Sequence, residues 1–204
     1  MSSEFWWYVA RSSGFIAWAT ALGSLVWGMA LSTRALGRRP RGPWLLDVHR
    51  YLGGLSIAFV ALHLVAIVAD SFVYFGIVDL FVPFATSYRS SAVAWGILAF
   101  WLLLAVEVSS LFMHRLPRKT WYGIHLSSYV IAVAATLHGL YVGTDTANPV
   151  YRWIGLITLG LIGFFTIYRV MAPVEPRGRS STGAGSRSYA AHLQAQGPQP
   201  PDWL

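Results

Sequence analysis

The chain has 204 residues, of which 55% are hydrophobic and only 11% charged, whereas soluble domains average about 25% charged residues. Its apolar residues come in long runs, so we predict one bundle of membrane-spanning helices and no second folded domain. The net charge is +7, but the basic residues cluster beside the apolar runs, where orientation signals lie, so we exclude a nucleic-acid partner. Cysteine is absent, which excludes disulfides and thiolate metal sites.

Five apolar segments approach or exceed the ~20 residues that cross the core of a bilayer. Because a segment in lipid must satisfy its own backbone hydrogen bonds, we predict that each is a helix. The predicted fold is therefore an all-α five-helix transmembrane bundle, a multi-pass protein of the cell membrane with the lipid bilayer as its first partner. In chain order the spans cover residues 14–31, 46–69, 92–113, 121–141 and 150–171.

Positive charge is unequal between the two sets of connections. Cytoplasmic connections carry an excess of Lys and Arg, so the richer set is predicted to face the cytoplasm. This orientation leaves the N-terminus outside and the C-terminus inside. The poorer set holds Arg11, Arg89 and Arg152, and the richer set holds the other twelve of the fifteen basic residues, namely Arg34, Arg38, Arg39, Arg41, Arg50, Arg115, Arg118, Lys119, Arg169, Arg177, Arg179 and Arg187.

Two stretches lie outside the predicted spans. Residues 70–90 are apolar but interrupted by Asp79 and Pro83, and a sixth span there would place the second basic loop outside. We expect a short interfacial segment, which is either a lid over an outer cofactor or ordinary packing. Residues 172–204 are rich in Pro, Gly, Ser and Arg and are predicted to be a disordered cytoplasmic tail, so that residues 1–171 form the membrane domain.

Four histidines lie inside the predicted spans, in pairs on two helices. His49 and His63 are 14 residues apart, and His125 and His138 are 13 residues apart. At a rise of about 1.5 Å per residue, each pair covers about 20 Å of helix. One span lies between the two helices, so both run in the same direction. His49 therefore lies at the depth of His125, and His63 at the depth of His138.

Imidazole is a standard axial ligand of haem iron, and an ionisable residue in a membrane span is costly and by default functional. The two pairs therefore predict two stacked haems, an inner one on His49 and His125 and an outer one on His63 and His138. Without cysteine these haems are non-covalent, of the b type. Iron with two protein ligands transfers electrons and leaves no position for oxygen.

The helical phase of the fourth span fits this arrangement less well than that of the second span. Fourteen residues at about 100° each return to within about 40° of the starting face, whereas thirteen miss it by about 140°. The fourth span is expected to bend, to tighten or to use different histidine rotamers, unless its haems are approached from different sides. The sequence leaves these alternatives open.

Three residues near the histidines are further candidates. Gly53 lies about one turn from His49 and would give a flat macrocycle clearance, although glycine also mediates close helix packing. Arg50 would hold an anionic haem propionate, although orientation alone explains most basic residues here. Glu107, in the third span, would relay protons, bind a quinone or support a propionate, or else is a neutral acid bonded to a serine.

Two other functions are compatible with histidines in membrane spans. A transporter of protons or metal ions would use polar residues that line a path, with ligands converging at one depth. The histidines instead separate to two depths, with Ile57, Ala58, Ile131 and Ala132 between them. A structural membrane subunit without a cofactor is the third possibility, and it predicts a colourless protein.

The histidine segments resemble the ferric reductase-like transmembrane family over about residues 45–145. The resemblance rests on HRYLGGLSIAFVALH in one span, HLSSYVIAVAATLH in another, and the basic loop LPRKTWYGIH that leads into His125. The family includes the membrane domains of NADPH oxidases and ferric reductases. It also includes the haem-binding subunit of the bacterial periplasmic methionine sulfoxide reductase system.

The resemblance implies that His49, His63, His125 and His138 hold two b-type haems, which pass electrons outward one at a time. Oxidases and ferric reductases continue into a flavin and nicotinamide domain, but here about 33 residues follow the last span, without a Gly-rich dinucleotide fingerprint. We therefore expect the electron-transfer subunit of an oxidoreductase, supplied by a separate cytoplasmic flavin reductase or by membrane quinol. The expected acceptor is extracytoplasmic: a partner oxidoreductase, a flavin protein, ferric iron or oxygen. The sulfoxide reductase subunit can also use a flavin, so FMN or a quinone is a further cofactor that the resemblance allows.

Overall fold

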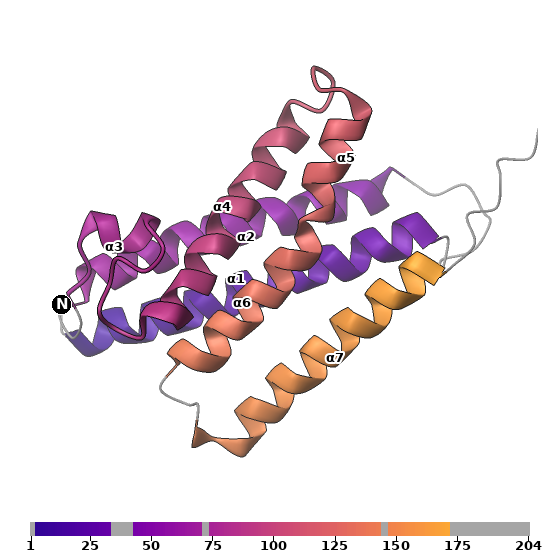
Figure 1. Cartoon of the computed structure of the whole chain (residues 1–204). Helices are drawn as coiled ribbons and strands as arrows, with labels where there is room; N and C mark the ends of the chain where they lie inside the picture. The colour runs from indigo at the N-terminus through magenta and orange to yellow at the C-terminus, as the bar shows by residue number, and fades with distance from the viewer. Residues whose placement is uncertain (1–2, 34–42, 71–73, 144–146, 172–204) are drawn as a thin grey trace, which may run out of the picture. The chain divides into compact units, whose positions relative to one another are not determined.

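The computed structural model describes residues 3–33, 43–70, 74–143 and 147–171, and no strand occurs in these ranges. The chain divides into two units, residues 1–170 and 171–204, and all the helices belong to the first apart from Met171, which ends the last one. The predicted tail, residues 172–204, lies outside the described residues. Figure 1 shows the helices α1 (Ser3–Thr33), α2 (Trp44–Ala69), α3 (Ile77–Phe81), α4 (Ser90–Leu111), α5 (Arg118–Leu126), α6 (Ser128–Val142) and α7 (Pro149–Met171).

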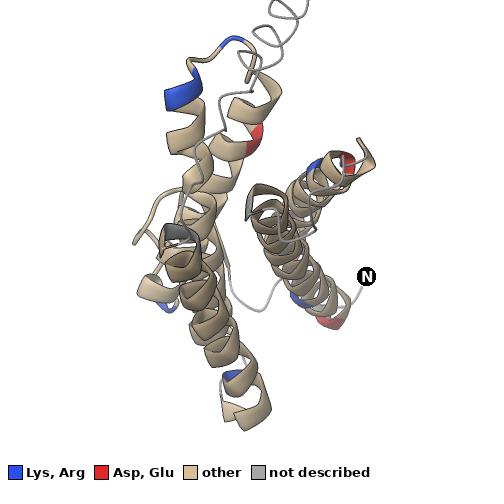
Figure 2. Ribbon diagram, turned by 90° about the vertical axis from the view of Figure 1, so that its right-hand side faces the viewer, with Lys and Arg blue, Asp and Glu red and all other residues tan. Residues whose placement is uncertain are grey.

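The predicted set of five membrane spans is confirmed. Five stretches are long and apolar enough to cross a bilayer: 4–32, 44–69, 90–111, 118–142 and 149–168. Between 11% and 39% of each span is buried against the rest of the described chain, so most of their apolar surface needs lipid around it. Charged residues lie toward the helix ends, as Figure 2 shows, and the long middles of the ribbons carry almost none. The chain is therefore a multi-pass integral membrane protein.

Helix α1 begins earlier than the apolar pattern predicts, at Ser3 instead of Gly14. The serine side chains of the polar run between these two positions form hydrogen bonds within the helix. Ser12 and Ser13 donate hydrogen bonds to the carbonyl oxygens of Tyr8 and Val9, at 2.8 and 2.6 Å. The Arg11 guanidinium lies 5.0 Å from the centre of the Trp7 ring. These local contacts let the helix continue through residues that hydropathy excludes from a span.

The bundle is built from two extensively packed pairs, α1 with α2 and α4 with α6. Helix α1 is tied to α2 by the Trp27 indole, which donates to the Leu45 carbonyl oxygen at 2.8 Å. It is tied to α6 by the Trp18 indole, which donates to Thr136 Oγ1 at 3.0 Å. Helix α7 packs on α1 and α6 through a cluster formed by Leu25, Met29, Ala132 and Ile162. The pairs α1–α2 and α4–α6 thus form the frame that holds His49, His63 and His138, and His125 lies on α5.

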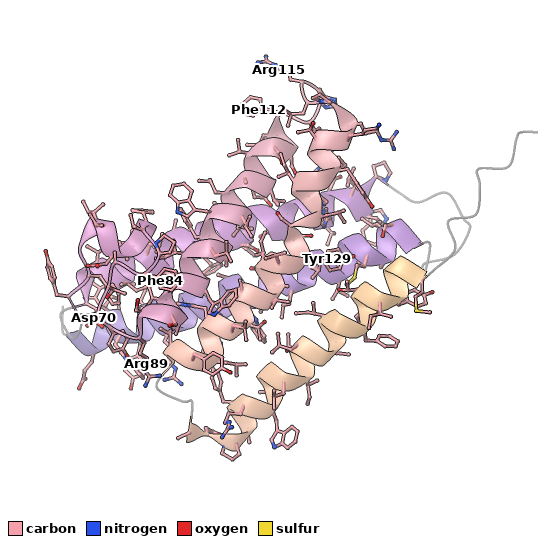
Figure 3. All side chains as sticks on the ribbon, viewed as in Figure 1. Asp70, Phe84, Arg89, Phe112, Arg115 and Tyr129 are labelled. Carbon is pink, nitrogen blue, oxygen red and sulfur yellow. The ribbon has the colours of Figure 1, made fainter. Side chains whose placement is uncertain are left out.

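The described residues between α2 and α4 form no sixth span, as predicted. Its only described helix is α3, whose first turn is capped by Asp79: the carboxylate accepts the Gly76 N–H at 2.9 Å. The Trp101 indole of α4 donates to the Phe81 carbonyl oxygen at 2.9 Å, so α3 rests against α4. Figure 3 shows Asp70, Phe84 and Arg89 at one end of the bundle and Phe112 and Arg115 at the other. Packing against α4 is therefore observed, whereas the lid role stays a prediction.

Candidate functional site: two histidine pairs

The four histidines meet in the two predicted pairs. The ring centres of His49 and His125 are 5.9 Å apart, and those of His63 and His138 are 6.5 Å apart. In both pairs the ring planes are steeply inclined, at 70° and 86°. Two imidazoles that bind opposite sides of one metal ion, each through a nitrogen about 2 Å from it, have ring centres about 6 Å apart. Both separations fit that requirement.

A break in the fourth span answers the phase problem raised by the thirteen-residue spacing. Helix α5 ends at Leu126 and α6 begins at Ser128, so His125 and His138 lie on separate helices. At the break, the Ser127 N–H donates to the Ile124 carbonyl oxygen at 3.0 Å, which is the tighter three-residue pattern of a 3₁₀ turn. Tightening and segmentation together let both rings reach their partners on α2.

Three of the histidines hydrogen bond a backbone carbonyl oxygen of a neighbouring helix through Nδ1. His49 contacts Ser24 at 3.0 Å, His63 contacts Ala10 at 2.6 Å and His138 contacts Ala92 at 2.9 Å. The Ser24 hydroxyl oxygen also lies 3.1 Å from Nδ1 of His49 and donates its own proton to the His49 carbonyl oxygen at 3.3 Å. A carbonyl oxygen can only accept, so each Nδ1 carries the proton and each Nε2 keeps its lone pair. This is the arrangement that orients a metal-binding histidine, whose second ring nitrogen donates to a carbonyl or carboxylate.

His125 is held differently. Its Nδ1 is buried and has no hydrogen-bond partner within the described ranges, and the same is true of Trp121 Nε1. The two rings stack, with centres 4.9 Å apart and planes inclined by 21°. His125 is therefore placed by stacking, whereas the other three are placed by hydrogen bonds.

An apolar layer separates the two pairs. Its buried members come from α4 and α6, and Ile57 and Val60 of α2 pack against them. Ile57 and Ile131 each lie about midway between the two histidines of their span. The buried residues of this layer are Ala99, Leu103, Val106, Ile131 and Ala134. The pairs are thus two sites at two depths, as the sequence predicts.

The remaining candidates have different surroundings. The Arg50 guanidinium lies 4.0 Å from the Asp47 carboxylate, and both side chains are largely exposed, so the pair is a weak surface contact. The Glu107 carboxyl fills the space in which Gly53 would carry a Cβ. Gly53 therefore makes room for Glu107, and its predicted clearance for a macrocycle is untested. Among the described residues no serine hydroxyl bonds Glu107, and Ser109 donates to the Val106 carbonyl instead.

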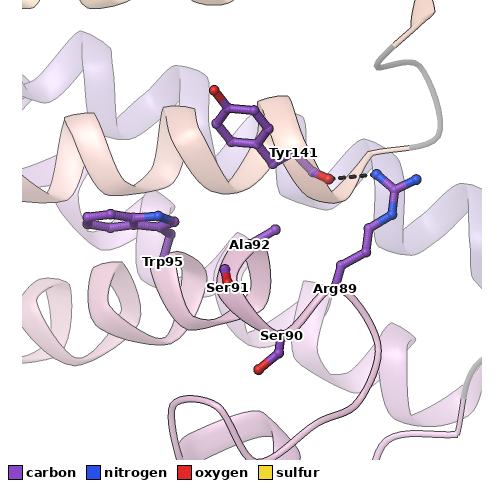
Figure 4. A pocket seen from close by; sticks show the side chains of 6 residues that line it. All are labelled: Arg89, Ser90, Ser91, Ala92, Trp95 and Tyr141. Atoms are coloured by element: carbon purple, nitrogen blue, oxygen red, sulfur yellow. Dashed lines mark hydrogen bonds between the residues drawn. The ribbon is translucent and has the colours of Figure 1, made fainter.

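A cavity of about 450 Å³ lies at the start of α4 beside Tyr141 of α6, and Figure 4 shows the residues that line it. One of its lining residues, Ala92, supplies the carbonyl that binds His138. The Arg89 guanidinium donates to the Tyr141 carbonyl oxygen at 2.6 Å across the opening. Sequence reasoning used Arg89 only as an orientation signal. Arg89, Ser90, Ser91, Ala92, Trp95 and Tyr141 line the cavity.

Three glycines that the sequence analysis did not single out lie directly against histidine rings. Gly14, Gly28 and Gly96 lie on α1 and α4, and a Cβ at each would touch His63, His49 and His138 respectively. One signal was present: Gly14 and Gly28 are 14 residues apart, the same spacing as His49 and His63. On antiparallel neighbouring helices, an equal spacing brings both glycines level with both histidines.

The fold and the paired histidines define a class, the multi-pass membrane proteins with two histidine pairs at two depths of one bundle. The family model of the ferric reductase like transmembrane component matches residues 13–136, more than half of the chain. The chain therefore belongs to the ferric reductase-like transmembrane family, whose general role is electron transfer across membranes and whose members often bind haem. No curated protein and no solved structure matched the chain.

Proposed function

We propose that this protein is a di-haem cytochrome b that carries electrons across the membrane. His49 and His125 hold one b-type haem, and His63 and His138 hold the other. The observation that carries the proposal is the meeting of the four rings in two pairs, 5.9 and 6.5 Å between ring centres, at two depths of a membrane bundle. Residues 1–171 form the haem-binding domain, and residues 172–204 are a cytoplasmic tail.

The donor chemistry of the histidines supports this assignment. A protonated Nδ1 leaves Nε2 of His49, His63 and His138 free to bind a metal, and none of these Nε2 atoms has a hydrogen-bond partner among the described residues. Haem iron with two imidazole ligands accepts and releases single electrons and has no open position for a substrate. The side chains of the apolar layer around Ile131 offer no polar group to water or protons.

The direction of transfer follows from the charge asymmetry of the sequence. With the basic connections in the cytoplasm, His49 and His125 form the inner site and His63 and His138 the outer one. Arg50, one residue from His49, then lies where a propionate of the inner haem would reach the aqueous boundary. The donor is a cytoplasmic flavin reductase or membrane quinol, with FMN or a quinone as an additional cofactor. The protein is thus the electron-transfer subunit of an oxidoreductase.

The acceptor is extracytoplasmic: a partner oxidoreductase, a flavin protein, ferric iron or oxygen. The cavity lined by Arg89, Trp95 and Tyr141 supports a contact at this end, because it adjoins the Ala92 carbonyl that binds His138.

Transport of protons or metal ions is less well supported. It requires ligands that converge at one depth, and in the described part of the chain no group of three or more His, Cys, Asp or Glu side chains is placed to hold a metal ion. The histidines meet only in twos, with an apolar layer between the pairs. A polar path from one face to the other, which transport needs, is therefore interrupted at Ile57 and Ile131.

An optical difference spectrum tests the proposal. Protein purified in detergent is measured after dithionite reduction and after oxidation, and haem is quantified against protein. We expect a sharp low-spin b-type spectrum with about two haems per chain. A colourless protein that also fails to bind added hemin would overturn the cytochrome assignment.

A further inference from the structure

A hydrogen bond from histidine to a helical carbonyl recurs three times in this bundle. The acceptors are Ala10 and Ser24 on α1 and Ala92 on α4, and the donors are His63, His49 and His138. These acceptor carbonyls lie inside helices, where carbonyl oxygens already accept the N–H four residues later. Each therefore serves at least two donors, and the Ala10 carbonyl oxygen also accepts the Ser13 hydroxyl at 3.1 Å. The close approach of an imidazole ring to such an occupied carbonyl needs an explanation.

The explanation is a glycine four residues after each acceptor. Gly14 follows Ala10, Gly28 follows Ser24 and Gly96 follows Ala92. A Cβ built on Gly14 or on Gly28 would lie 3.1 Å from the ring of His63 or His49. A Cβ on Gly96 would lie 2.6 Å from Nδ1 of His138, which is closer than real contacts allow. At Gly96 the ring occupies the space of the missing side chain, and at Gly14 and Gly28 it lies so close that an added Cβ would press against it.

Helix geometry accounts for the four-residue offset. A side chain leans toward the N-terminus of its helix and covers the preceding turn, so a side chain at position i+4 shields the carbonyl of position i. Removing that side chain exposes one helical carbonyl to a neighbouring helix without breaking the helix itself. A glycine placed there opens an acceptor that is fixed in direction by the helix around it.

We propose that Gly14, Gly28 and Gly96 are positioning residues for the haem ligands. Each acts through its histidine: it exposes the carbonyl that holds the Nδ1 proton, and so directs Nε2 toward the iron. The inference rests on the proposed function, because it assigns the purpose of these contacts to haem binding. It also divides the glycines between the sites: Gly14 and Gly96 serve the His63–His138 pair, and Gly28 serves the His49–His125 pair.

The contacts affect electronics as well as position. Donation from Nδ1 to a carbonyl makes the imidazole a stronger ligand, which stabilises ferric over ferrous iron. A ring pushed off its carbonyl binds ferric iron less well, and the midpoint potential of that haem rises. A purely structural role of the glycine would lower thermal stability without shifting the potential of one haem alone.

The experiment is a series of glycine-to-alanine variants with matched controls. Gly96→Ala, Gly14→Ala and Gly28→Ala are compared with Gly54→Ala and Gly160→Ala, where an added Cβ meets nothing within 4 Å. The measurements are haem affinity and stoichiometry, the potential of each haem, and the low-spin ferric EPR signal, which reports the angle between axial imidazole planes. Loss of an orienting partner of a metal-bound histidine costs about 10- to 100-fold in affinity.

We expect Gly96→Ala to lose haem affinity by about that factor and to change the EPR signal of the His63–His138 haem. Gly14→Ala and Gly28→Ala should shift the midpoint potential and the EPR signal of a haem even where that haem is retained. Gly14→Ala should act on the His63–His138 haem and Gly28→Ala on the His49–His125 haem. Wild-type spectra and potentials in all three variants would overturn the inference, as would equal changes in the two controls.

A measurement without haem separates this inference from the proposed function. The ¹⁵N resonances of labelled histidine in the haem-free protein report which ring nitrogen carries the proton. We expect the Nδ1–H form for His138 in the wild type and its loss in Gly96→Ala. Were wild-type protein to bind no haem, the proposed function would fail while the tautomer result still tested the glycine contact. A Gly96→Ala protein that folds and keeps the proton on Nδ1 of His138 would contradict the proposed role of the glycine.

Discussion

Trp121 lies flat against His125, one helical turn away on α5, with ring centres 4.9 Å apart and planes inclined by 21°. His125 is the one proposed ligand whose Nδ1 is buried without a hydrogen-bond partner in the described part of the chain. Stacking on the indole thus replaces the carbonyl contact that fixes His49, His63 and His138. The His49–His125 pair combines one hydrogen-bonded ring with one stacked ring.

Replacing Trp121 should therefore weaken the haem of this pair selectively. An aromatic pair is worth about 0.5–1.5 kcal/mol beyond its buried area, which corresponds to between about twofold and tenfold in affinity. We expect Trp121→Leu to lose haem affinity within this range and Trp121→Phe to retain most of it. Hemin titration of each variant in a His63→Ala background isolates the site. Equal affinity of Trp121→Leu and the wild type would show that stacking does not hold the ring.

Removing one ligand of each pair should empty the two sites separately. His63→Ala is expected to lose the haem shared with His138 and to keep haem on His49 and His125, because an apolar layer separates the pairs. His49→Ala should show the reverse. Haem-to-protein ratios and resolved potentials check both outcomes. Two full haems per chain in His63→Ala would refute the ligand assignment.

Gly53 and Glu107 should show strong energetic coupling. The Glu107 carboxyl lies where a Gly53 Cβ would be, so Gly53→Ala forces that side chain away from α2. Overpacking of this kind costs about 1–3 kcal/mol of unfolding free energy. We expect Glu107→Ala to relieve the cost, which a double-mutant cycle of thermal stability in detergent would measure.

The neighbouring Gly54 supplies the control for that cycle. A Cβ there meets nothing within 4 Å, so Gly54→Ala should be close to neutral alone and additive with Glu107→Ala. Additivity of Gly53→Ala with Glu107→Ala would contradict the contact between α2 and α4 at this point.

Gly155 should be needed for α7 to pack on α6. A Cβ at Gly155 would overlap the side chain of Leu140, so Gly155→Ala must displace that side chain or one of the two helices. We expect a loss of about 1–3 kcal/mol, measured as a lower thermal midpoint. Gly163→Ala, on the same helix and facing open space, should show no loss. Similar midpoints for both variants would mean that α7 is not docked through this contact.

The proposed orientation can be mapped with single cysteines, because the chain has none of its own. His114→Cys marks the loop between α4 and α5, and Tyr74→Cys marks the segment before α3, where the side chain is 90% exposed. With the basic loops inside, a membrane-impermeant maleimide should label Tyr74→Cys in intact cells and His114→Cys only after permeabilisation. The opposite pattern would invert the inner and outer haem assignments.

Much of the architecture could be predicted because it depends on composition along the chain. Apolar runs set the number of spans, since lipid requires every backbone group to be bonded within its own segment. The 14- and 13-residue spacings then set the depths of His49, His63, His125 and His138 through the helical rise alone. The start of α1 was missed because Ser12 and Ser13 bond their own helix, which hydropathy does not register.

The sequence by itself determined which residues lie at which depth and that the histidines form two matched sets. Only the tertiary structure decided how each ring is held: His63 by a carbonyl opened by Gly14, His138 by one opened by Gly96, and His125 by the face of Trp121. Depth along a helix is a local property, fixed by the rise per residue. Which face of α1 or α4 meets a given imidazole depends on the rotation and packing of helices, and that is set by contacts between residues far apart in the chain.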